Sequence, residues 1–414
     1  MTKKLVVISD IGHFPDSLIW FKEQGFDLYY VELKHIYEHL GTSRDMFRTM
    51  GANWVYVNEL EKLHDKLDSE TLVISGPTFA GSVPTVSGSV LDLEKGEPYC
   101  PVTMERMETV YTLSKYNHDH KCGAKFVLFF NGDTGFGSQR MVDFFNEKIQ
   151  YVDALMFDND LLRDMVLQNS KVARTKQTLI GWLETPLKRY VIHQTKKPKH
   201  QIISLGRCLS ALEVMKNNKI RLPITYFPSS NPRPKIKDLV RYLRHRIKGR
   251  RSRYRLTGLT GSMRKLKRDR LAFLKFESAR AFGLSHMYDV FIGGVERFQK
   301  DRAYYLSAEG NRVAQCANTP KELYYPFVNN PNKEACYLMY GIIPLISHAE
   351  NNYYKTLLEK KMAILIREKQ DFYNALAMSD AEIQQYRDNI YANRDLFTFD
   401  HVGEMLLDLL NKKI

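Results

Sequence analysis

The sequence has few cysteines and no long hydrophobic run. Its five cysteines form no CxxC pair, and an odd number without such a pair suggests neither a disulfide framework nor a zinc site. The longest apolar run, Tyr337–Ile346, is too short to span a bilayer and contains a glycine. The cysteine pattern favours a reduced, intracellular setting. The five cysteines are Cys100, Cys122, Cys208, Cys316 and Cys336.

Two recognisable motifs are also absent. Lys3 and Lys4 lead directly into an apolar segment, without the h-region and cleavage site of a secretory signal peptide. The glycine-rich stretch Gly132–Ser138 lacks the lysine of a Walker A motif, which excludes a P-loop there.

What the sequence does contain is alternation of apolar strands and helices. At 414 residues the chain exceeds the usual size of one hydrophobic core. Strand and helix patterns alternate from Leu5 to Leu183, which is typical of a parallel, doubly wound sheet. The pattern stops at Pro186–His200, which carries a cluster of lysines and two prolines, and a second β/α series begins at Gln201. This series includes an expected strand at Asp289–Ile292.

The predicted fold class is therefore α/β, with two Rossmann-like doubly wound domains. The expected division is a first domain at 1–185, a linker at 186–200, a second domain at 201–395 with a basic insertion at 228–270, and a C-terminal helix at 396–414.

One stretch of the second series carries a ligand-site pattern. Asn332–Tyr340 is predicted as a helix that ends at Gly341, and the apolar Ile342–Ile346 as a buried strand. The loop that follows lies at the carboxyl end of that strand, where open α/β sheets bind ligands. Glu334, on the helix, is placed to accept hydrogen bonds from a ribose.

Positive charge is concentrated in one segment. The whole chain has a net charge of +14, and Arg233–Arg270 alone holds sixteen Lys and Arg against two Asp, which is also +14. Three interpretations stay open: nucleic-acid binding, favoured by the excess of arginine; binding to anionic lipid, favoured by an amphipathic helix pattern; and a solvated surface. The candidate nucleic-acid contacts are Arg241, Arg244, Lys248, Arg250, Arg251, Arg253 and Arg255.

Three short pieces carry a resemblance to a known family. They are Phe126–Asp133 (FVLFFNGD), Ile203–Arg207 (ISLGR) and Glu334–Ile346. Together with the two β/α series they resemble GT-B glycosyltransferases, and within them phage DNA glucosyltransferases most. The resemblance implies that the two domains face a cleft and that the C-terminal helix at 396–414 crosses back to the first domain. It also implies a nucleotide-sugar donor, with UDP-sugar expected, bound mostly by the second domain. The implied donor-binding residues are Gly206, Arg207 and Glu334. Gly293 and Gly294, after the expected strand Asp289–Ile292, are donor-binding candidates on their position, where a β-turn is the alternative.

Two residues are candidates for the catalytic base. Asp133 ends the first of these pieces and opens a loop with three glycines, where a carboxylate could take a proton from an acceptor hydroxyl. His13 lies in Gly12–Pro15 (GHFP), which is similar to the GHxxP segment of inverting GT-B enzymes. The choice between the two stays open.

The sequence gives weak support for a metal. Asp158, Asn159 and Asp160 follow an apolar strand, which suits either a metal-binding DxD motif or the N-cap of the next helix. We favour the cap and expect no required metal, with a divalent cation still possible. The paired glutamates of retaining enzymes are absent, because Pro326 stands eight positions before Glu334.

We therefore expect an inverting glycosyltransferase that moves a sugar onto a hydroxymethylated pyrimidine in DNA. The protein is expected to be a cytoplasmic monomer, in the host cytoplasm if a phage encodes it. One alternative is a bacterial transferase of capsule or lipopolysaccharide synthesis that acts on lipid-linked glycans at the membrane surface. Another is a nucleic-acid-binding protein on an inactive transferase scaffold.

Overall fold

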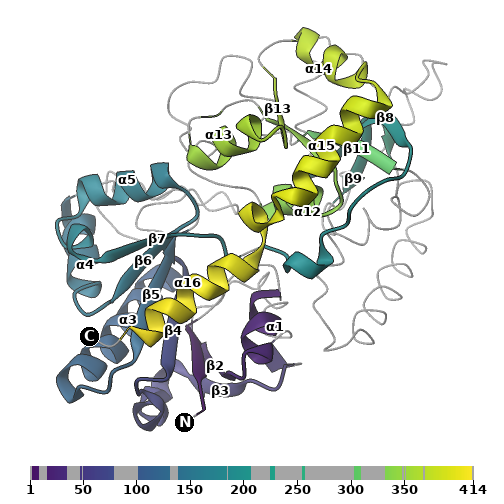
Figure 1. Cartoon of the computed structure of the whole chain (residues 1–414). Coiled ribbons are helices and arrows are strands. Elements are labelled where there is room, and N and C mark those ends of the chain that lie inside the picture. Colours follow the sequence, from purple (N-terminus) through teal and green to yellow (C-terminus); the bar gives the residue numbers. More distant parts are fainter. Residues whose placement is uncertain are drawn as a thin grey trace, which may run out of the picture.

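The computed structural model contains two parallel β-sheets joined in one chain (Figure 1). The residues that it describes are 2–8, 16–34, 47–48, 50–78, 101–130, 139–183, 185–206, 224–228, 254–256, 303–308, 332–346, 349, 351–366 and 369–412.

The first sheet has seven strands in the order β3-β2-β1-β4-β5-β6-β7, and every neighbouring pair is parallel. Its first six positions follow the 3-2-1-4-5-6 order of the Rossmann fold. The strands are β1 Lys4–Ile8, β2 Asp27–Glu32, β3 Asn53–Tyr56, β4 Thr71–Thr78, β5 Lys125–Phe130, β6 Ala154–Phe157 and β7 Gln177–Ile180.

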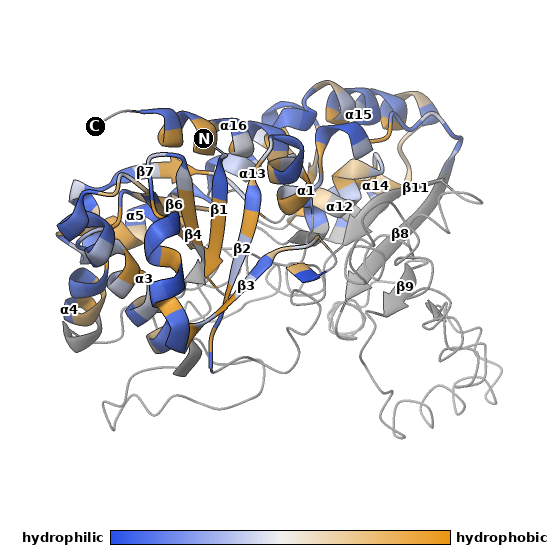
Figure 2. Ribbon diagram, turned by 90° about the horizontal axis from the view of Figure 1, so that it is seen from below, coloured by the Kyte–Doolittle hydropathy of each residue, from blue (hydrophilic) through white to orange (hydrophobic). Residues whose placement is uncertain are grey.

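The first sheet is covered on both faces, as a doubly wound sheet must be. Leu5 and Val7 of β1 pack into one core with residues of α1 and α16, whereas Val6 and Ile8 pack into a second core with residues of α3, α4 and α5. Figure 2 shows β1 largely in the hydrophobic colour. The helical segments are α1 Asp16–Glu23, η2 Val57–Lys66, α3 Pro101–His120, α4 Gln139–Lys148, α5 Asp160–Asn169 and η4 Ala173–Thr175.

The second sheet repeats the same topology. Its order is β10-β9-β8-β11-β12-β13, which is again 3-2-1-4-5-6 with all neighbouring strands parallel. Two Rossmann-type sheets in one chain confirm the predicted α/β class. The strands are β8 Pro198–Gly206, β9 Ile224–Pro228, β10 Tyr254–Leu256, β11 Ala303–Ala308, β12 Ile343–Ile346 and β13 Ile364–Leu365.

The described helices of the second half begin with α12, which ends at Gly341 with φ +66°, as the sequence predicts. Asn351 caps α13 by accepting a hydrogen bond from the Tyr354 N–H at 2.8 Å, and Ser379 and Glu382 form a capping box at α15. The segments are α12 Asn332–Met339, α13 Asn352–Glu359, α14 Lys369–Leu376, α15 Asp380–Ala392, η7 Arg394–Phe397 and α16 Phe399–Asn411, with η5 Lys188–Tyr190 between the sheets.

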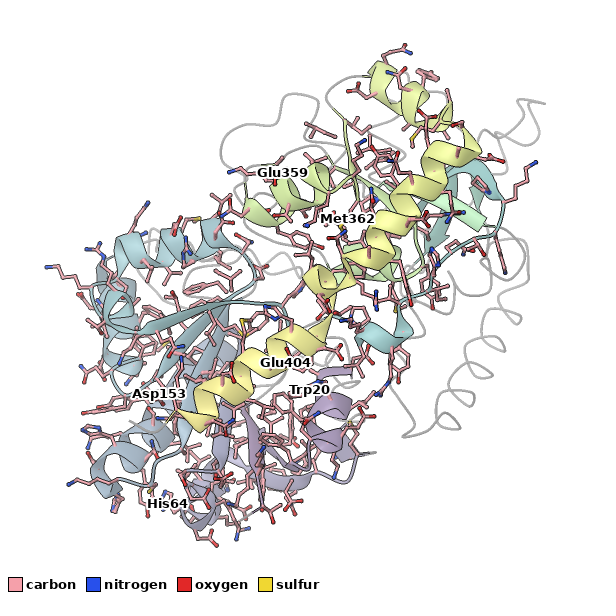
Figure 3. The ribbon with its side chains drawn as sticks, in the orientation of Figure 1. Trp20, His64, Asp153, Glu359, Met362 and Glu404 are labelled. Carbon is pink, nitrogen blue, oxygen red and sulfur yellow. The ribbon has the colours of Figure 1, made fainter. Side chains whose placement is uncertain are left out.

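The last helix, α16, packs on the first sheet rather than on the second. Phe399 is fully buried and meets the rings of Trp20 and Phe21 edge-on, each at a centroid distance of 5.7 Å. Val402, Leu406 and other apolar residues of α16 belong to the same core as β1 and α1. Trp20 lies beside α16 in Figure 3. Two Rossmann-type sheets with a last helix that returns to the first sheet are the architecture of the GT-B fold.

The structure differs from the sequence analysis at three strands, β10, β11 and β8. The basic segment 228–270 is not simply an insertion, because Tyr254–Leu256 within it forms the edge strand β10. Strand β11, Ala303–Ala308, was not predicted, although it lies between β8 and β12. The strand expected at Asp289–Ile292 lies outside the described residues. Strand β8 begins at Pro198, before its expected start at Gln201.

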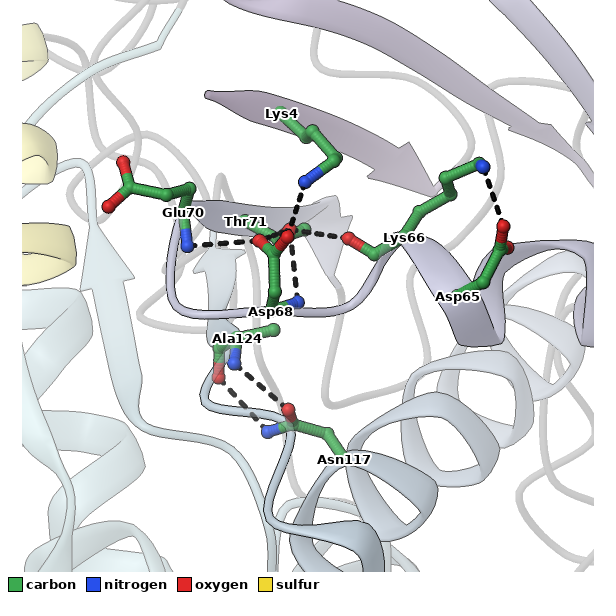
Figure 4. Close-up of polar contacts among 8 residues, drawn as sticks. All are labelled: Lys4, Asp65, Lys66, Asp68, Glu70, Thr71, Asn117 and Ala124. Carbon is green, nitrogen blue, oxygen red and sulfur yellow. Dashed lines mark hydrogen bonds and ion pairs between the residues drawn. The ribbon is translucent and has the colours of Figure 1, made fainter. Parts of the chain in front are cut away.

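Polar contacts fix the loops at the amino edge of the first sheet (Figure 4). The Asp68 carboxylate accepts hydrogen bonds from Lys4 Nζ at 2.6 Å, Thr71 Oγ1 at 2.8 Å and the Glu70 N–H at 3.0 Å. The Asn117 side chain donates to the Ala124 carbonyl at 3.0 Å and accepts from the Ala124 N–H at 2.9 Å. These contacts hold the turns before β4 and β5, at the edge opposite the expected ligand site.

Candidate functional site

The carboxyl edges of the two sheets are the places where this fold would bind ligands. In open α/β sheets, ligands bind outside the carboxyl ends of the strands, where the strand order reverses. That point lies between β1 and β4 in the first sheet, where Ile8 is paired with Ser75. In the second sheet it lies between β8 and β11, where Ile203 is paired with Ser307.

Both candidate bases lie outside the described residues. The elements that flank them are described: β1 ends at Ile8 and α1 begins at Asp16 around His13, and β5 ends at Phe130 before Asp133. Because all seven strands are parallel, the carboxyl ends of β1 and β5 lie at the same edge. The catalytic roles of His13 and Asp133 stay predictions.

The expected donor site is described only in part. Gly206 is the last residue of β8 and pairs with Pro228 of β9, at the carboxyl edge of the second sheet. Arg207, Gly293 and Gly294 lie outside the described residues.

Glu334 lies in the first turn of α12 and is only 2% exposed. Helix α12 connects β11 to β12, so its first turn lies on the carboxyl side of the second sheet. The next residue, Ala335, is fully buried in the core shared with β1, α1 and α16. Glu334 is therefore enclosed where the second half of the chain meets the core of the first. Its role in ribose binding stays a prediction, with the added condition that a ligand must reach an enclosed carboxylate.

Of the candidate nucleic-acid contacts, the structure places one. Arg255 is the middle residue of β10, paired with Thr225 of β9. Since β10 is the last strand on its side of the second sheet, this part of the basic segment is tied to a sheet edge. The others, Arg241, Arg244, Lys248, Arg250, Arg251 and Arg253, lie outside the described residues.

The segment Asp158–Asp160 is the start of a helix, as the sequence analysis favoured. Asn159 is the N-cap of α5, and its side chain accepts a hydrogen bond from the Leu162 N–H at 2.9 Å. Its amide also donates to Asp158 Oδ1 at 2.8 Å. Within the ranges that the structure describes, no group of three or more His, Cys, Asp or Glu side chains could hold a metal ion.

The contact between the two carboxyl edges was not predicted. Asp160 Oδ1 accepts a hydrogen bond of 2.8 Å from the backbone N–H of Asn352, which is 192 positions away. Asp160 starts the helix that follows β6, and Asn352 starts the helix that follows β12. Beside them, the rings of Trp182 and Tyr353 meet edge-on at 5.7 Å. The carboxyl edges of the two sheets therefore face each other at this point.

Several polar side chains are buried along these facing edges. In the first sheet, Asp16 and Ser17 open α1 with no exposed surface, and Ser75 near the end of β4 is 1% exposed. In the second sheet, Asn351 is fully buried in front of α13. Buried polar groups are costly unless they are hydrogen-bonded, and Asn351 meets this condition as the N-cap of α13. The positions of Asp16 and Asn351 at helix starts were visible in the sequence, whereas the burial of these side chains was not.

No helix in the described part of the chain is long and apolar enough to cross a bilayer.

Comparison with known proteins gives distant structural neighbours only. No family model matches the chain, and no curated protein matches it. A UDP-GlcNAc 2-epimerase from Neisseria meningitidis bound to UDP-GlcNAc is similar with a TM-score of 0.46 and 10% identity, over 99% of this chain and 100% of that one. Anabaena HepE in complex with UDP and glucose gives 0.45 and 8%, over 100% of both chains. Arabidopsis thaliana UGT89C1 with UDP-L-rhamnose gives 0.40 and 9%, over 99% and 100%. At these values the fold is defined by the two strand orders rather than by the neighbours.

Proposed function

We propose that the chain is a nucleotide-sugar-dependent glycosyltransferase. The observation that carries the proposal is the hydrogen bond between Asp160 and Asn352, which brings together the carboxyl edges of two Rossmann-type sheets. Ligands bind at the carboxyl edge of such a sheet. Sugar transfer needs two ligands, a donor and an acceptor, held close together in a reactive orientation.

In this proposal the second sheet holds the donor. The edge that ends in Gly206, with Arg207, Gly293, Gly294 and Glu334, takes a nucleotide sugar, for which we propose a UDP-sugar. A guanidinium at the start of a helix suits a diphosphate, because its fork matches the phosphate oxygens and the free helix N–H groups add to it. A glutamate carboxylate can accept hydrogen bonds from ribose hydroxyls.

The first sheet would then hold the acceptor and the base. Asp133 or His13 removes the proton from the acceptor hydroxyl as its oxygen bonds to the anomeric carbon. The bond from that carbon to the donor phosphate oxygen breaks, and the nucleoside diphosphate leaves with the electron pair. Arg207 stabilises the negative charge on the leaving diphosphate. One displacement inverts the anomeric configuration.

We further propose DNA as the acceptor, through a hydroxymethylated pyrimidine. The support is the excess of sixteen Lys and Arg over two Asp in Arg233–Arg270. Arginine contacts phosphates well, and a base would have to leave the helical stack to reach an enclosed site. The chain would work as two domains, 1–185 and 201–395, each built around one of the two sheets.

A thermal-shift screen of nucleotide sugars tests the donor half of the proposal. A donor that binds only the folded chain raises the melting temperature, and the stabilisation grows with the logarithm of its concentration over its dissociation constant. If no nucleotide sugar at millimolar concentration shifts the melting temperature, the donor proposal is wrong.

Transfer assays test the acceptor. We expect sugar transfer to duplex DNA with hydroxymethylated pyrimidines, none to unmodified DNA, and a loss of turnover in Asp133→Asn or His13→Gln. Turnover only with lipid-linked glycans would favour the cell-surface glycan alternative. DNA binding without turnover of any donor would favour a binding protein on an inactive scaffold.

A further inference from the structure

The first residues of the linker 186–200 are hydrogen-bonded to helices that pack on the first sheet. The Pro186 carbonyl accepts a hydrogen bond from the Phe399 N–H at 2.9 Å, and the Lys188 N–H donates to Asp400 Oδ2 at 2.6 Å. The Arg189 guanidinium makes two hydrogen bonds of 2.7 Å to the Glu23 carboxylate of α1. This part of the linker is therefore fixed to α1 and α16.

The next residues of the linker are anchored to the second half of the chain. The Ile192 N–H donates to the Met339 carbonyl at 2.8 Å, and Arg387 donates to the Lys196 carbonyl at 2.6 Å. Burial lowers the pKa of the Arg387 guanidinium to about 10. This part of the linker is therefore fixed to α12 and α15.

Between these two sets of contacts lie only Tyr190 and Val191, so the linker passes from the first half to the second within these two residues. The chain crosses between the halves again near Thr398, since Phe397 packs in the core of the second half and Phe399 in that of the first. Rotation about these two crossings would change the separation of the carboxyl edges, and the packing of Ala335 and Tyr353 against the core of the first half opposes it.

The hydrogen bond from Asn352 to Asp160 is a contact of a different kind, because it joins the edges themselves. The first N–H groups of a helix have no partner within the helix. At α13, the Asn351 side chain takes the Tyr354 N–H, and Asp160 takes the Asn352 N–H from across the interface. The first turn of α13 is thus capped by side chains from both halves of the chain.

The charge of Asp160 also suits this position. Asp160 is the first residue of α5, so its carboxylate lies near the positive end of that helix as well as that of α13. Negative charge near a helix N-terminus is stabilising. Here one carboxylate lies near the N-termini of two helices, one from each half of the chain. An asparagine would keep the acceptor oxygen and lose the charge, whereas an alanine would lose both.

We propose that Asp160 is a positioning residue for the transfer reaction: by capping α13 across the interface, it fixes the separation of the donor-holding and acceptor-holding edges. The inference rests on the proposed function. The inference goes beyond the proposed function because it assigns a role to a carboxylate outside the proposed donor and acceptor contacts. Without the cap the edges separate by rotation at Tyr190–Val191 and Thr398, while each sheet keeps its own fold.

A distance measurement tests this without substrate. Spin labels on non-natural amino acids at the exposed positions Asn169 and Glu359 report the separation of the two halves. We expect a longer and broader distance distribution in Asp160→Ala than in the unsubstituted chain, and an intermediate one in Asp160→Asn. An Asp164→Ala variant, which removes a carboxylate of the same helix that pairs with the adjacent Arg163, is the matched control. Identical distributions for Asp160→Ala and the unsubstituted chain would overturn the proposal.

Kinetics then test the positioning role. We expect Asp160→Ala to bind the nucleotide sugar within twofold of the unsubstituted chain, because the donor contacts lie on the second sheet, and to lose at least tenfold in kcat. Asp160→Asn should recover part of that loss and Asp164→Ala should show none. A fall in donor affinity with unchanged kcat would contradict the role. If the unsubstituted chain binds no nucleotide sugar, the proposed function fails, whereas the distance measurement still stands on its own.

Discussion

Gly403 of α16 lies directly against the ring of Trp20 on α1. A Cβ added at position 403 would come within 2.7 Å of two Trp20 ring carbons, closer than real Cβ contacts allow. The Trp20 ring cannot move aside easily, because it is 6% exposed and meets Phe21 at 5.3 Å and Phe399 at 5.7 Å. Close packing of the last helix on the first sheet therefore requires a glycine at this position.

Gly403→Val is expected to destabilise the protein through this contact. Overpacking costs about 1–3 kcal/mol, and the better helix propensity of valine returns less than about 0.5 kcal/mol. Chemical denaturation measures the difference. His401→Ala, an exposed change on the same helix, is the control and should stay within about 0.5 kcal/mol. Equal stability of Gly403→Val and the unsubstituted chain would show that α16 does not pack on α1.

Asn159→Ala removes the cap of α5 and is expected to cost about 0.5–2 kcal/mol. The buried Asn159 side chain accepts from Leu162 N–H and donates to Asp158, so both contacts disappear together. Urea unfolding curves measure the loss, with the exposed Gln168→Ala on the same helix as control. If Asn159→Ala loses no more stability than Gln168→Ala, Asn159 does not act as the cap of α5.

The Asp68 carboxylate gives the protein a pH-dependent contribution to stability. Burial alone would raise the pKa of Asp68, but hydrogen bonds from Lys4, Thr71 and Glu70 together hold it below its ordinary value (Figure 4). A carboxyl whose pKa is lowered by folding stabilises the protein above its unfolded value, about 3.9, and loses that contribution as pH falls through the folded value.

Asp68→Asn should therefore melt at a lower temperature than the unsubstituted chain at pH 7, and the gap should narrow as pH falls below about 4. Melting curves from pH 7 to pH 3 measure it. Asp65→Asn is the control, because the ion pair of Asp65 with the adjacent Lys66 lies at the surface, where solvent screening leaves it little effect on stability. A gap that stays constant over this range would show that the charge of Asp68 contributes nothing.

Replacing Arg250, Arg251 and Arg253 with alanine should weaken DNA binding and its dependence on salt. Each lost phosphate contact lowers the slope of log K against log salt by about 0.9, so the slope should fall by up to about 3 units. Fluorescence anisotropy at several salt concentrations measures it. A variant with alanine at the exposed Lys62, Lys171 and Lys355 removes the same charge elsewhere. Equal slopes for the two variants would mean that the basic segment does not contact DNA.

The strands and helix ends that could be predicted are those with a local signal. The apolar run Lys125–Phe130 is strand β5 with every residue buried. Gly341 ends α12 in the left-handed conformation that favours glycine, and Asn159 caps α5. In each case the residue types within a few positions of one another are enough to define the backbone.

The strands that were missed lack such a signal. Strand β10 has three residues within an arginine-rich run, too few for a periodicity to show. Strand β11 mixes two tyrosines and a serine with apolar residues, and its place between β8 and β12 comes from pairing with segments far away in the chain. Pairing partners at such separations are not encoded in the short segment itself.

Hydrophobic periodicity and helix caps act over a few residues, so the amino-acid sequence alone is enough to predict two β/α series. Which edges face each other depends instead on how the two halves pack. Asp160 was visible as a carboxylate at a helix start, but its partner across the interface is the backbone N–H of Asn352. Every residue other than proline carries such an N–H, so no residue type marks it, and only the packing of the two halves brings it within 2.8 Å of Asp160.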